Sequence, residues 1–142
     1  MSDFDEKVVD RIKRLEREVE RLRVKESPGA WLAWTPTVTG WAAAGYICIA
    51  RYCKVGKMVS VKIRITGTSD SASVYVTLPF TSVSNGVNAW AYAMDNGTAT
   101  ATPAYVVLDT TSKIKVYLNA TGTPWTASGS KRVFTTFTYE AE

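Results

Sequence analysis

Five apolar residues near the start of the chain recur at intervals of four, three, four and three, the spacing of a heptad repeat. These residues are Val8, Ile12, Leu15, Val19 and Leu22. Ile12 and Val19 take heptad position a, and the other three take position d. The pattern predicts a helix over residues 3–26, capped by Ser2 or Asp3. Because a helix of this length with so narrow an apolar stripe is not stable alone in water, it also predicts a coiled coil with other chains.

The number of chains in this coil has two interpretations. β-Branched residues at a with leucine at d favour a dimer. The segment from Arg11 to Glu16, Arg-Ile-Lys-Arg-Leu-Glu, instead resembles the Arg-apolar-x-x-apolar-Glu signature of parallel trimeric coiled coils, in which the arginine reaches the glutamate of a neighbouring chain. We therefore expect a homotrimer. The predicted oligomerisation residues are Val8, Arg11, Ile12, Leu15, Glu16, Val19 and Leu22. The alternatives are a dimer and a surface helix packed on its own β domain.

Charge separates this helix from the rest of the chain. Residues 1–28 carry eight acidic and eight basic side chains, whereas the remaining residues carry only five acidic and nine basic ones. A segment so poor in charge and rich in Thr, Ser, Ala, Val and Tyr is typical of an all-β domain. Its small positive surplus falls short of the basic stripe of nucleic-acid-binding proteins, so nucleic acid is not an expected partner.

Alternation of apolar and polar residues predicts the strands of this second part. Within 57–66, Val59, Val61, Ile63 and Ile65 share one face. The predicted strands are 46–54, 57–66, 74–78, 87–94, 98–102, 104–108, 113–118 and 131–139. We therefore expect a mainly β chain, with a coiled-coil helix over 1–27, a neck or linker over 28–44 and an antiparallel, jelly-roll-like β-sandwich over 45–142. Trp31, Trp34 and Trp41 are expected to pack at the neck.

Short motifs in this order resemble a known class of viral proteins. A Trp34-Thr-Pro-Thr segment precedes an Arg51-Tyr-x-x-x-Gly-Lys hairpin, and a Val76-Thr-Leu-Pro-Phe strand end follows. The first half of the β region is in this way similar to the β domains of tailed-bacteriophage fibre, minor tail and head-fibre proteins. No motif is placed after residue 80. The resemblance implies a trimeric virion appendage, often at the point of host contact, and carries over no ligand-binding residues.

Nothing in the chain predicts catalysis. The sequence has no histidine, and Asp70, Asp95 and Asp109 fall in predicted turns, where aspartate is a common turn former. No nucleophile elbow, phosphate loop or metal-ligand spacing occurs, and Cys48 and Cys53 are interpreted as free thiols on opposite faces of a hairpin. We therefore expect no enzyme activity, no cofactor and no metal.

Ligand-binding candidates come from the β region. Trp125 lies in the longest predicted loop, 120–130, where it would either stack on a sugar ring or plug the end of the sandwich. Lys62 and Arg64, near a second basic group of Arg51, Lys54 and Lys57, would either meet an acidic polymer or form an ordinary solvated face. In the strand 87–94, Trp90, Tyr92 and Met94 are expected in the core. The opposite face, Ala89, Ala91 and Ala93, is suited to close approach by another surface.

The leading hypothesis is a non-enzymatic phage virion structural or adhesion protein, a trimeric fibre or decoration component at the tail tip or head surface. Its expected partners are other copies of itself, other virion proteins and a host surface glycan or protein. The alternative is a carbohydrate-binding, lectin-like trimeric module of non-viral origin. The charged first 28 residues do not resemble a signal peptide, and prolines and glycines interrupt the uncharged stretch 27–50, so no membrane insertion is expected.

Overall fold

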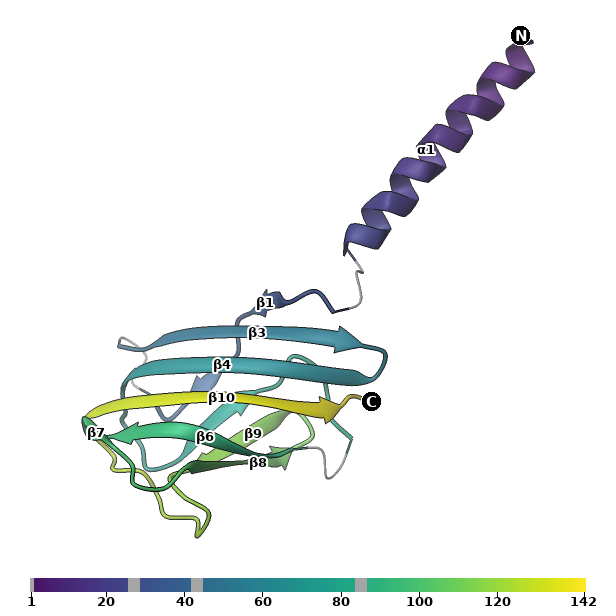
Figure 1. Cartoon of the computed structure of the whole chain (residues 1–142). Coiled ribbons are helices and arrows are strands. Elements are labelled where there is room, and N and C mark those ends of the chain that lie inside the picture. The colour runs from purple at the N-terminus through teal and green to yellow at the C-terminus, as the bar shows by residue number, and fades with distance from the viewer. Residues whose placement is uncertain (1, 26–28, 42–44, 84–86) are drawn as a thin grey trace. The chain divides into compact units, whose positions relative to one another are not determined.

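The computed structural model describes residues 2–25, 29–41, 45–83 and 87–142. The chain divides into two compact units, residues 1–30 and residues 31–142. The first contains one helix and the second contains all the strands (Figure 1). The chain is thus mainly β with one N-terminal helix, as the residue patterns predict.

Helix α1 (Asp3–Lys25) begins as predicted and is capped by Ser2. The backbone N–H of Asp5 donates to Ser2 Oγ at 3.3 Å, and the backbone N–H of Ser2 donates back to Asp5 Oδ2 at 3.2 Å. This reciprocal pair satisfies two amides that a helix start leaves without partners. The expected last helical residue, Glu26, lies outside the described residues.

The β unit consists of one antiparallel sheet rather than the predicted two-sheet sandwich. Its strands are β1 (Leu32–Trp34), β2 (Val38–Thr39), β3 (Ile47–Val55), β4 (Met58–Thr68), β5 (Val74–Thr77), β6 (Asn88–Asp95), β7 (Thr98–Ala99), β8 (Ala104–Thr110), β9 (Lys113–Tyr117) and β10 (Ser130–Glu140). Their order is β1-β3-β4-β10-β6-β8-β9-β5-β2, with β7 beside β6. The sheet is continuous because β10 pairs with β4 on one side and with β6 on the other.

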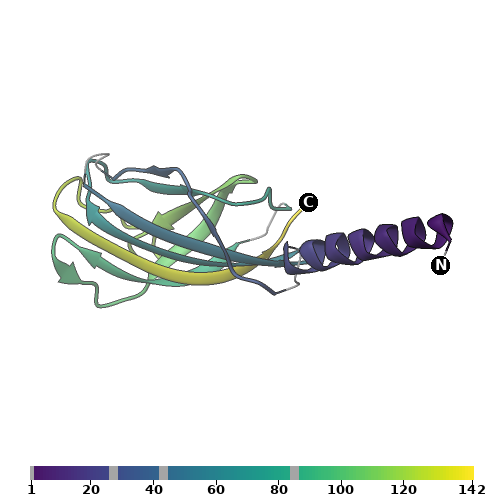
Figure 2. The ribbon, with the colours of Figure 1, turned by 90° about the horizontal axis from the view of Figure 1, so that it is seen from above.

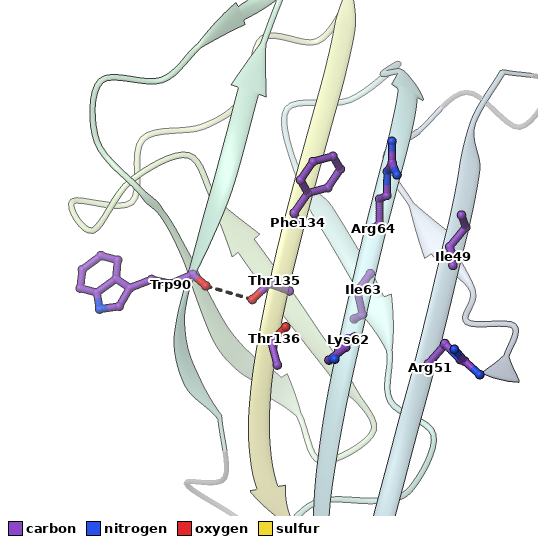
Figure 3. Close-up of a pocket in the computed structure, with 9 residues that line it drawn as sticks. All are labelled: Ile49, Arg51, Lys62, Ile63, Arg64, Trp90, Phe134, Thr135 and Thr136. Carbon is purple, nitrogen blue, oxygen red and sulfur yellow. Dashed lines mark hydrogen bonds between the residues drawn. The ribbon is translucent and has the colours of Figure 1, made fainter. Parts of the chain in front are cut away.

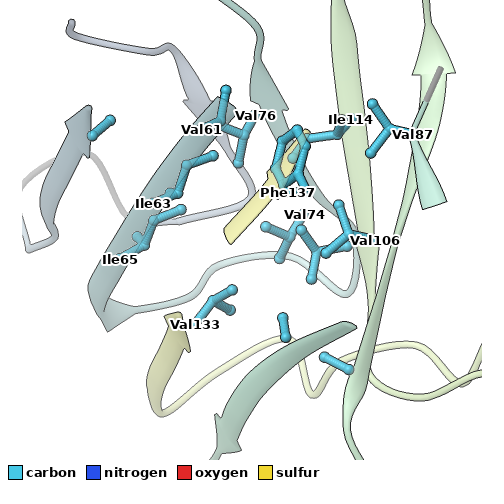
Figure 4. Packing of buried hydrophobic residues seen from close by; sticks show 14 of the residues in the cluster. Val61, Ile63, Ile65, Val74, Val76, Val87, Val106, Ile114, Val133 and Phe137 are labelled. Carbon is cyan, nitrogen blue, oxygen red and sulfur yellow. The ribbon is translucent and has the colours of Figure 1, made fainter. Parts of the chain in front are cut away.

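The continuous sheet curls and encloses a core on its inner face. In Figure 1, β3, β4, β10 and β6 form the near layer with β9 behind them, and Figure 2 shows the bend of the strands from above. Strand twist accumulates over many strands and produces such a curl. The predicted alternation in β4 is confirmed: Val59, Val61, Ile63 and Ile65 are all buried. All four belong to one buried cluster, in which Val61, Ile63 and Ile65 face Val74 and Val76 of β5, with Ile114 and Val106 close by (Figure 4).

The orientation predicted for β6 is wrong. Ala91 and Ala93 are buried in the core, whereas Trp90 and Tyr92 are exposed. β10 places Val133 opposite Ala93 and also buries Phe137 on the same inner face. These large side chains leave room for only small ones on β6, so its aromatic side chains point outward. The alanine face therefore packs against the chain's own core and is not a surface for another molecule.

The predicted neck also belongs in large part to the β unit. β1 pairs with β3, β2 pairs with β5, and Trp41 is buried with 3% of its surface exposed. Trp34 packs edge-on against Tyr52, with ring centroids 6.0 Å apart. The described part of the predicted linker from Trp31 onward is therefore integrated in the sheet and its core. Residues 28 and 42–44 of that linker lie outside the described residues.

Candidate functional site

Trp125, the predicted sugar platform, is buried. Only 3% of its surface is exposed, and its indole Nε1–H donates to the carbonyl of Val116 at 2.8 Å. Its backbone N–H also donates to the carbonyl of Ala72. Of the two alternatives for Trp125, a sugar-stacking platform and a plug of the β domain, its burial favours the second. Its ring fills the core, because a buried indole with a satisfied N–H contributes more apolar packing than an exposed one.

Lys62 and Arg64, the other two predicted ligand-binding residues, do lie on the surface. They alternate along β4 with the buried Val61 and Ile63, so core packing on the inner face directs them outward. Lys62 Nζ lies 4.5 Å from the ring centroid of Trp31. The guanidinium carbon of Arg64 lies 4.9 Å from the ring centroid of Phe134. Both cations are held over aromatic rings, which attract a positive charge through the electron density of the ring face.

The second basic group is divided between the two faces of the sheet. Arg51 stands opposite Lys62 in the register of β3 and β4 and donates from Nη2 to the carbonyl of Trp31 at 3.4 Å. Lys54, three residues further along β3, points to the other face, and its Nζ lies 4.4 Å from the Phe80 ring centroid. An odd spacing along a strand always separates side chains in this way. Only Arg51 therefore joins Lys62 and Arg64.

These three cations line a shallow groove of about 390 Å³ on the outward side of β3, β4, β10 and β6, called the outer face below (Figure 3). The outward side chains that line it are Ile49, Arg51, Lys62, Arg64, Trp90, Phe134 and Thr136. Trp90 is 57% exposed and stands at the β6 end of the groove. Its carbonyl accepts a hydrogen bond from Thr135 Oγ1 at 2.9 Å, which ties β6 to β10 here (Figure 3).

A second hollow of about 320 Å³ lies on the other side of Trp90. Thr102, Pro103 and the segment 119–121 line it together with the indole. Tyr105 supports the Trp90 ring at a centroid distance of 5.2 Å and an interplanar angle of 49°. Trp90 thus separates a cationic groove from a hollow lined by hydroxyl and amide groups.

The residue pattern alone did not identify Trp90 as a surface residue. β6 carries small apolar side chains on one face and large ones on the other, and either face satisfies a strand alternation. The signal that decides between them is the bulk of Val133, Phe137 and the β4 side chains, which fill the core. This bulk can be taken into account only when the strands that pack beside β6 are known.

Charge around the groove is not balanced. Among the described residues, no acidic side chain lines it. Two carboxylates of the β unit are engaged elsewhere: Asp109 pairs with Lys113 at 3.3 Å, and Asp95 pairs with Lys131. Burial alone would raise the pKa of Asp95. The hydrogen bonds from Lys131 and Thr126 outweigh this effect and hold the pKa below its ordinary value of 3.8. Asp95 is thus an ion-pair partner as well as a turn residue.

Within the described ranges, no group of three or more His, Cys, Asp or Glu side chains is placed to hold a metal ion. Cys48 and Cys53 are free. No helix in the described part of the chain combines the length and apolar character needed to cross a membrane.

The predicted oligomerisation residues lie on α1. The five apolar ones, Val8, Ile12, Leu15, Val19 and Leu22, are between 39% and 50% exposed. Arg11 and Glu16 are exposed on the same helix. Their part in a coiled coil stays a prediction, because one helix alone defines a stripe but not its partner.

Comparison with known proteins does not place the chain in a family. No protein-family profile matches it, and neither curated proteins nor solved structures give a significant match. Its function is therefore argued from the helix stripe and from the outer face of the sheet.

Proposed function

We propose that the chain is a non-enzymatic structural and adhesion protein of a tailed-bacteriophage virion, assembled as a homotrimer through α1. The observation that carries this proposal is the regular apolar stripe of α1. Each stripe residue exposes between 39% and 50% of its surface. An isolated helix of this kind has too little packing to be stable in water, and the heptad spacing of the stripe favours other helices with the same spacing as its partners.

The trimer and the virion rest on the resemblances in the sequence. The segment Arg11–Glu16 is similar to a trimer signature, and the motifs of the β region are similar to those of phage appendage proteins. A coil joined to a β unit with its own core suits a small fibre, in which the helices join the copies and the sheets carry the contact surface. The exposed Trp90 and its neighbouring cations form the surface through which the sheet contacts a host cell.

The native mass of the full chain, measured by light scattering, tests the assembly. A trimer has three times the 15.6 kDa mass of the chain. A shortened chain that starts at Ala30 lacks α1 but keeps the whole β unit, and we expect it to form a smaller or weaker oligomer. A monomeric full chain would contradict the proposal, since its stripe would then have to be covered by its own β unit.

Mass spectrometry of phage particles purified from the source culture tests the virion role. The proposal expects peptides of this chain in intact particles, at a ratio to the major capsid protein that stays constant through density-gradient purification. Their absence from such particles, with the protein present in the same lysate, would exclude a virion component.

The second candidate is a carbohydrate-binding, lectin-like trimeric module of non-viral origin. The observation that favours it is the exposed indole of Trp90 beside polar and cationic side chains, an arrangement typical of sugar-binding surfaces. It shares the trimer with the leading proposal. The two are separated by the particle analysis, because a free lectin is not part of a virion.

A further inference from the structure

Four basic side chains gather on the outer face: Arg51, Lys62, Arg64 and Arg132. Within the described residues, none of them forms an ion pair with a carboxylate. Arg132 stands 5.7 Å from the Phe134 ring centroid, and its buried Nε has no hydrogen-bond partner in the described part of the chain. Aromatic rings position Lys62, Arg64 and Arg132 without neutralising them, and Arg51 is held by its hydrogen bond to the carbonyl of Trp31. The face therefore keeps a positive potential that attracts anions.

Trp90 adds an aromatic platform to this charge. It is the only one of the five tryptophans that is classed as exposed, and it borders hollows on two sides. Tyr105 packs against it and fixes its orientation. A fixed, exposed indole offers a flat apolar surface with little conformational entropy to lose when a ligand packs on it.

We propose that the groove beside Trp90 binds an anionic saccharide, with a sugar ring stacked on the Trp90 indole and its acidic group hydrogen-bonded by Lys62 and Arg64. This inference rests on the adhesion role proposed above and names its ligand class. Charge-assisted hydrogen bonds from ammonium and guanidinium groups are strong and suit carboxylate, phosphate and sulfate alike. The hollow beyond Trp90 suits the uncharged part of the saccharide, because Thr102, Pro103 and Ala120 line it beside the indole. The side chains of Asn119 and Thr121 hydrogen-bond to each other and hold the shape of its far wall.

A second copy of the chain is a poorer occupant of this groove. Its β unit would have to supply acidic side chains to match the cations. After residue 28 the chain has only five acidic side chains against nine basic ones, and two of the five, Asp95 and Asp109, are already paired within their own unit. Nucleic acid is also a poorer fit. It requires a long basic track with stacking platforms for successive bases, whereas a single exposed tryptophan stands beside this short cationic groove.

Calorimetric titration of the full chain with three pairs of oligosaccharides tests the proposal. The pairs are oligogalacturonate with its methyl ester, a phosphomannan oligosaccharide with its dephosphorylated form, and a dextran sulfate oligomer with dextran of equal length. Each pair keeps the sugar rings and removes the charge. At least one charged member should bind about tenfold or more tightly than its neutral counterpart, and the pair that does so identifies the acidic group.

Two variants separate stacking from charge. Trp90→Ala and the double variant Lys62→Gln with Arg64→Gln should each weaken this binding by about tenfold or more. The matched control is Lys113→Gln with Lys115→Gln, which removes the same charge from β9, where Lys115 stands over Tyr75 and Tyr117. Its affinity should stay within about twofold of the unmodified chain.

Three outcomes would overturn the site: no charged oligosaccharide binds, inorganic polyphosphate binds equally tightly with no effect of Trp90→Ala, or Trp90→Ala lowers the native mass. The last would make the outer face an interface between copies. Native mass is measured for the unmodified chain and for each variant, so that the proposed trimer and the proposed saccharide site are tested separately. A trimer that binds none of the saccharides overturns only the site, whereas a monomer whose binding depends on Trp90 overturns only the trimer.

Discussion

Among single residues, Lys131 has the most demanding environment. It is fully buried, yet its Nζ bonds to the carboxylate of Asp95, to Thr126 Oγ1 and to the carbonyl of Ser128 at 2.8 Å. Thr126 Oγ1 also donates to Asp95 at 2.7 Å. A buried ammonium is tolerated only when such partners replace water. This cluster ties the loop before β10 to the end of β6.

We predict that Asp95→Asn lowers the free energy of unfolding by about 2 kcal/mol at pH 7, because it leaves the buried Lys131 charge without its counterion. The pKa of Asp95 is held below 3.8 in the folded chain. A lowered folded-state pKa contributes stability above the unfolded value, and this stability is lost as the pH falls through the folded pKa. The difference between the two proteins should therefore shrink on acidification below 3.8. Urea unfolding from pH 7 to pH 2 measures it.

The control for this prediction is Asp109→Asn, which removes the same charge from the more exposed pair with Lys113. Such a pair contributes less than about 1 kcal/mol, so this variant should stay close to the unmodified chain. Equal losses for both aspartates, or a difference for Asp95 that does not change with pH, would contradict the role given to the buried pair.

At the scale of elements, α1 is distinguished by its apolar stripe, whose five residues are each between 39% and 50% exposed. We predict that Leu15→Asp with Val19→Asp dissociates the proposed trimer at micromolar concentration. Losing a buried aliphatic side chain costs about 2–5 kcal/mol, and a carboxylate in its place adds a desolvation penalty. Native mass and helical circular dichroism should fall together, because the free helix is not stable.

Arg14→Asp with Arg17→Asp is the control for the stripe. It introduces the same side chains at heptad positions c and f, away from a and d, and should leave the trimer in place. If the Leu15 and Val19 variant stayed trimeric, the β units would hold the copies together and α1 would not be the main interface.

At the scale of the whole molecule, the sheet depends on its last strand. β10 pairs along its full length with β4, from Ser130 opposite Thr68 to Glu140 opposite Met58, and also pairs with β6. β10 must therefore be present before the two halves of the sheet can join. Contacts of such long sequence separation make folding slow.

We predict that a chain ending at Gly129 does not fold. It lacks β10, including the buried Val133, Phe137 and Tyr139, and both β4 and β6 lose their partner. Near-ultraviolet circular dichroism should show no fixed aromatic environment. The chain that starts at Ala30 loses more residues but no strand, so it should keep its signal and a cooperative unfolding transition. A folded chain ending at Gly129 would contradict the central role of β10.

Local patterns in the sequence were sufficient for the elements that depend on neighbours along the chain. The heptad spacing predicted α1, and the alternation in β4 predicted which side chains are buried. A turn at Asp95 was also predicted, and the two residues that follow it, Asn96 and Gly97, have positive φ angles of 49° and 80°. In each case the local structure depends on residues only a few positions apart, so it can be predicted from the sequence.

Only the tertiary structure decided the rest. One curled sheet replaced the expected sandwich because β10 bridges β4 and β6, and Trp125 became a core residue while Trp90 became a surface one. Lys131 lies on the same inward face of β10 as Val133 and Phe137, and a lysine at such a position indicates a buried ion pair. Its partner, Asp95, lies on another strand and could not be identified from the sequence. The buried face of a strand depends on the volume of side chains that are distant in sequence. The partner of a buried charge is likewise distant in sequence. Only folding brings these side chains together.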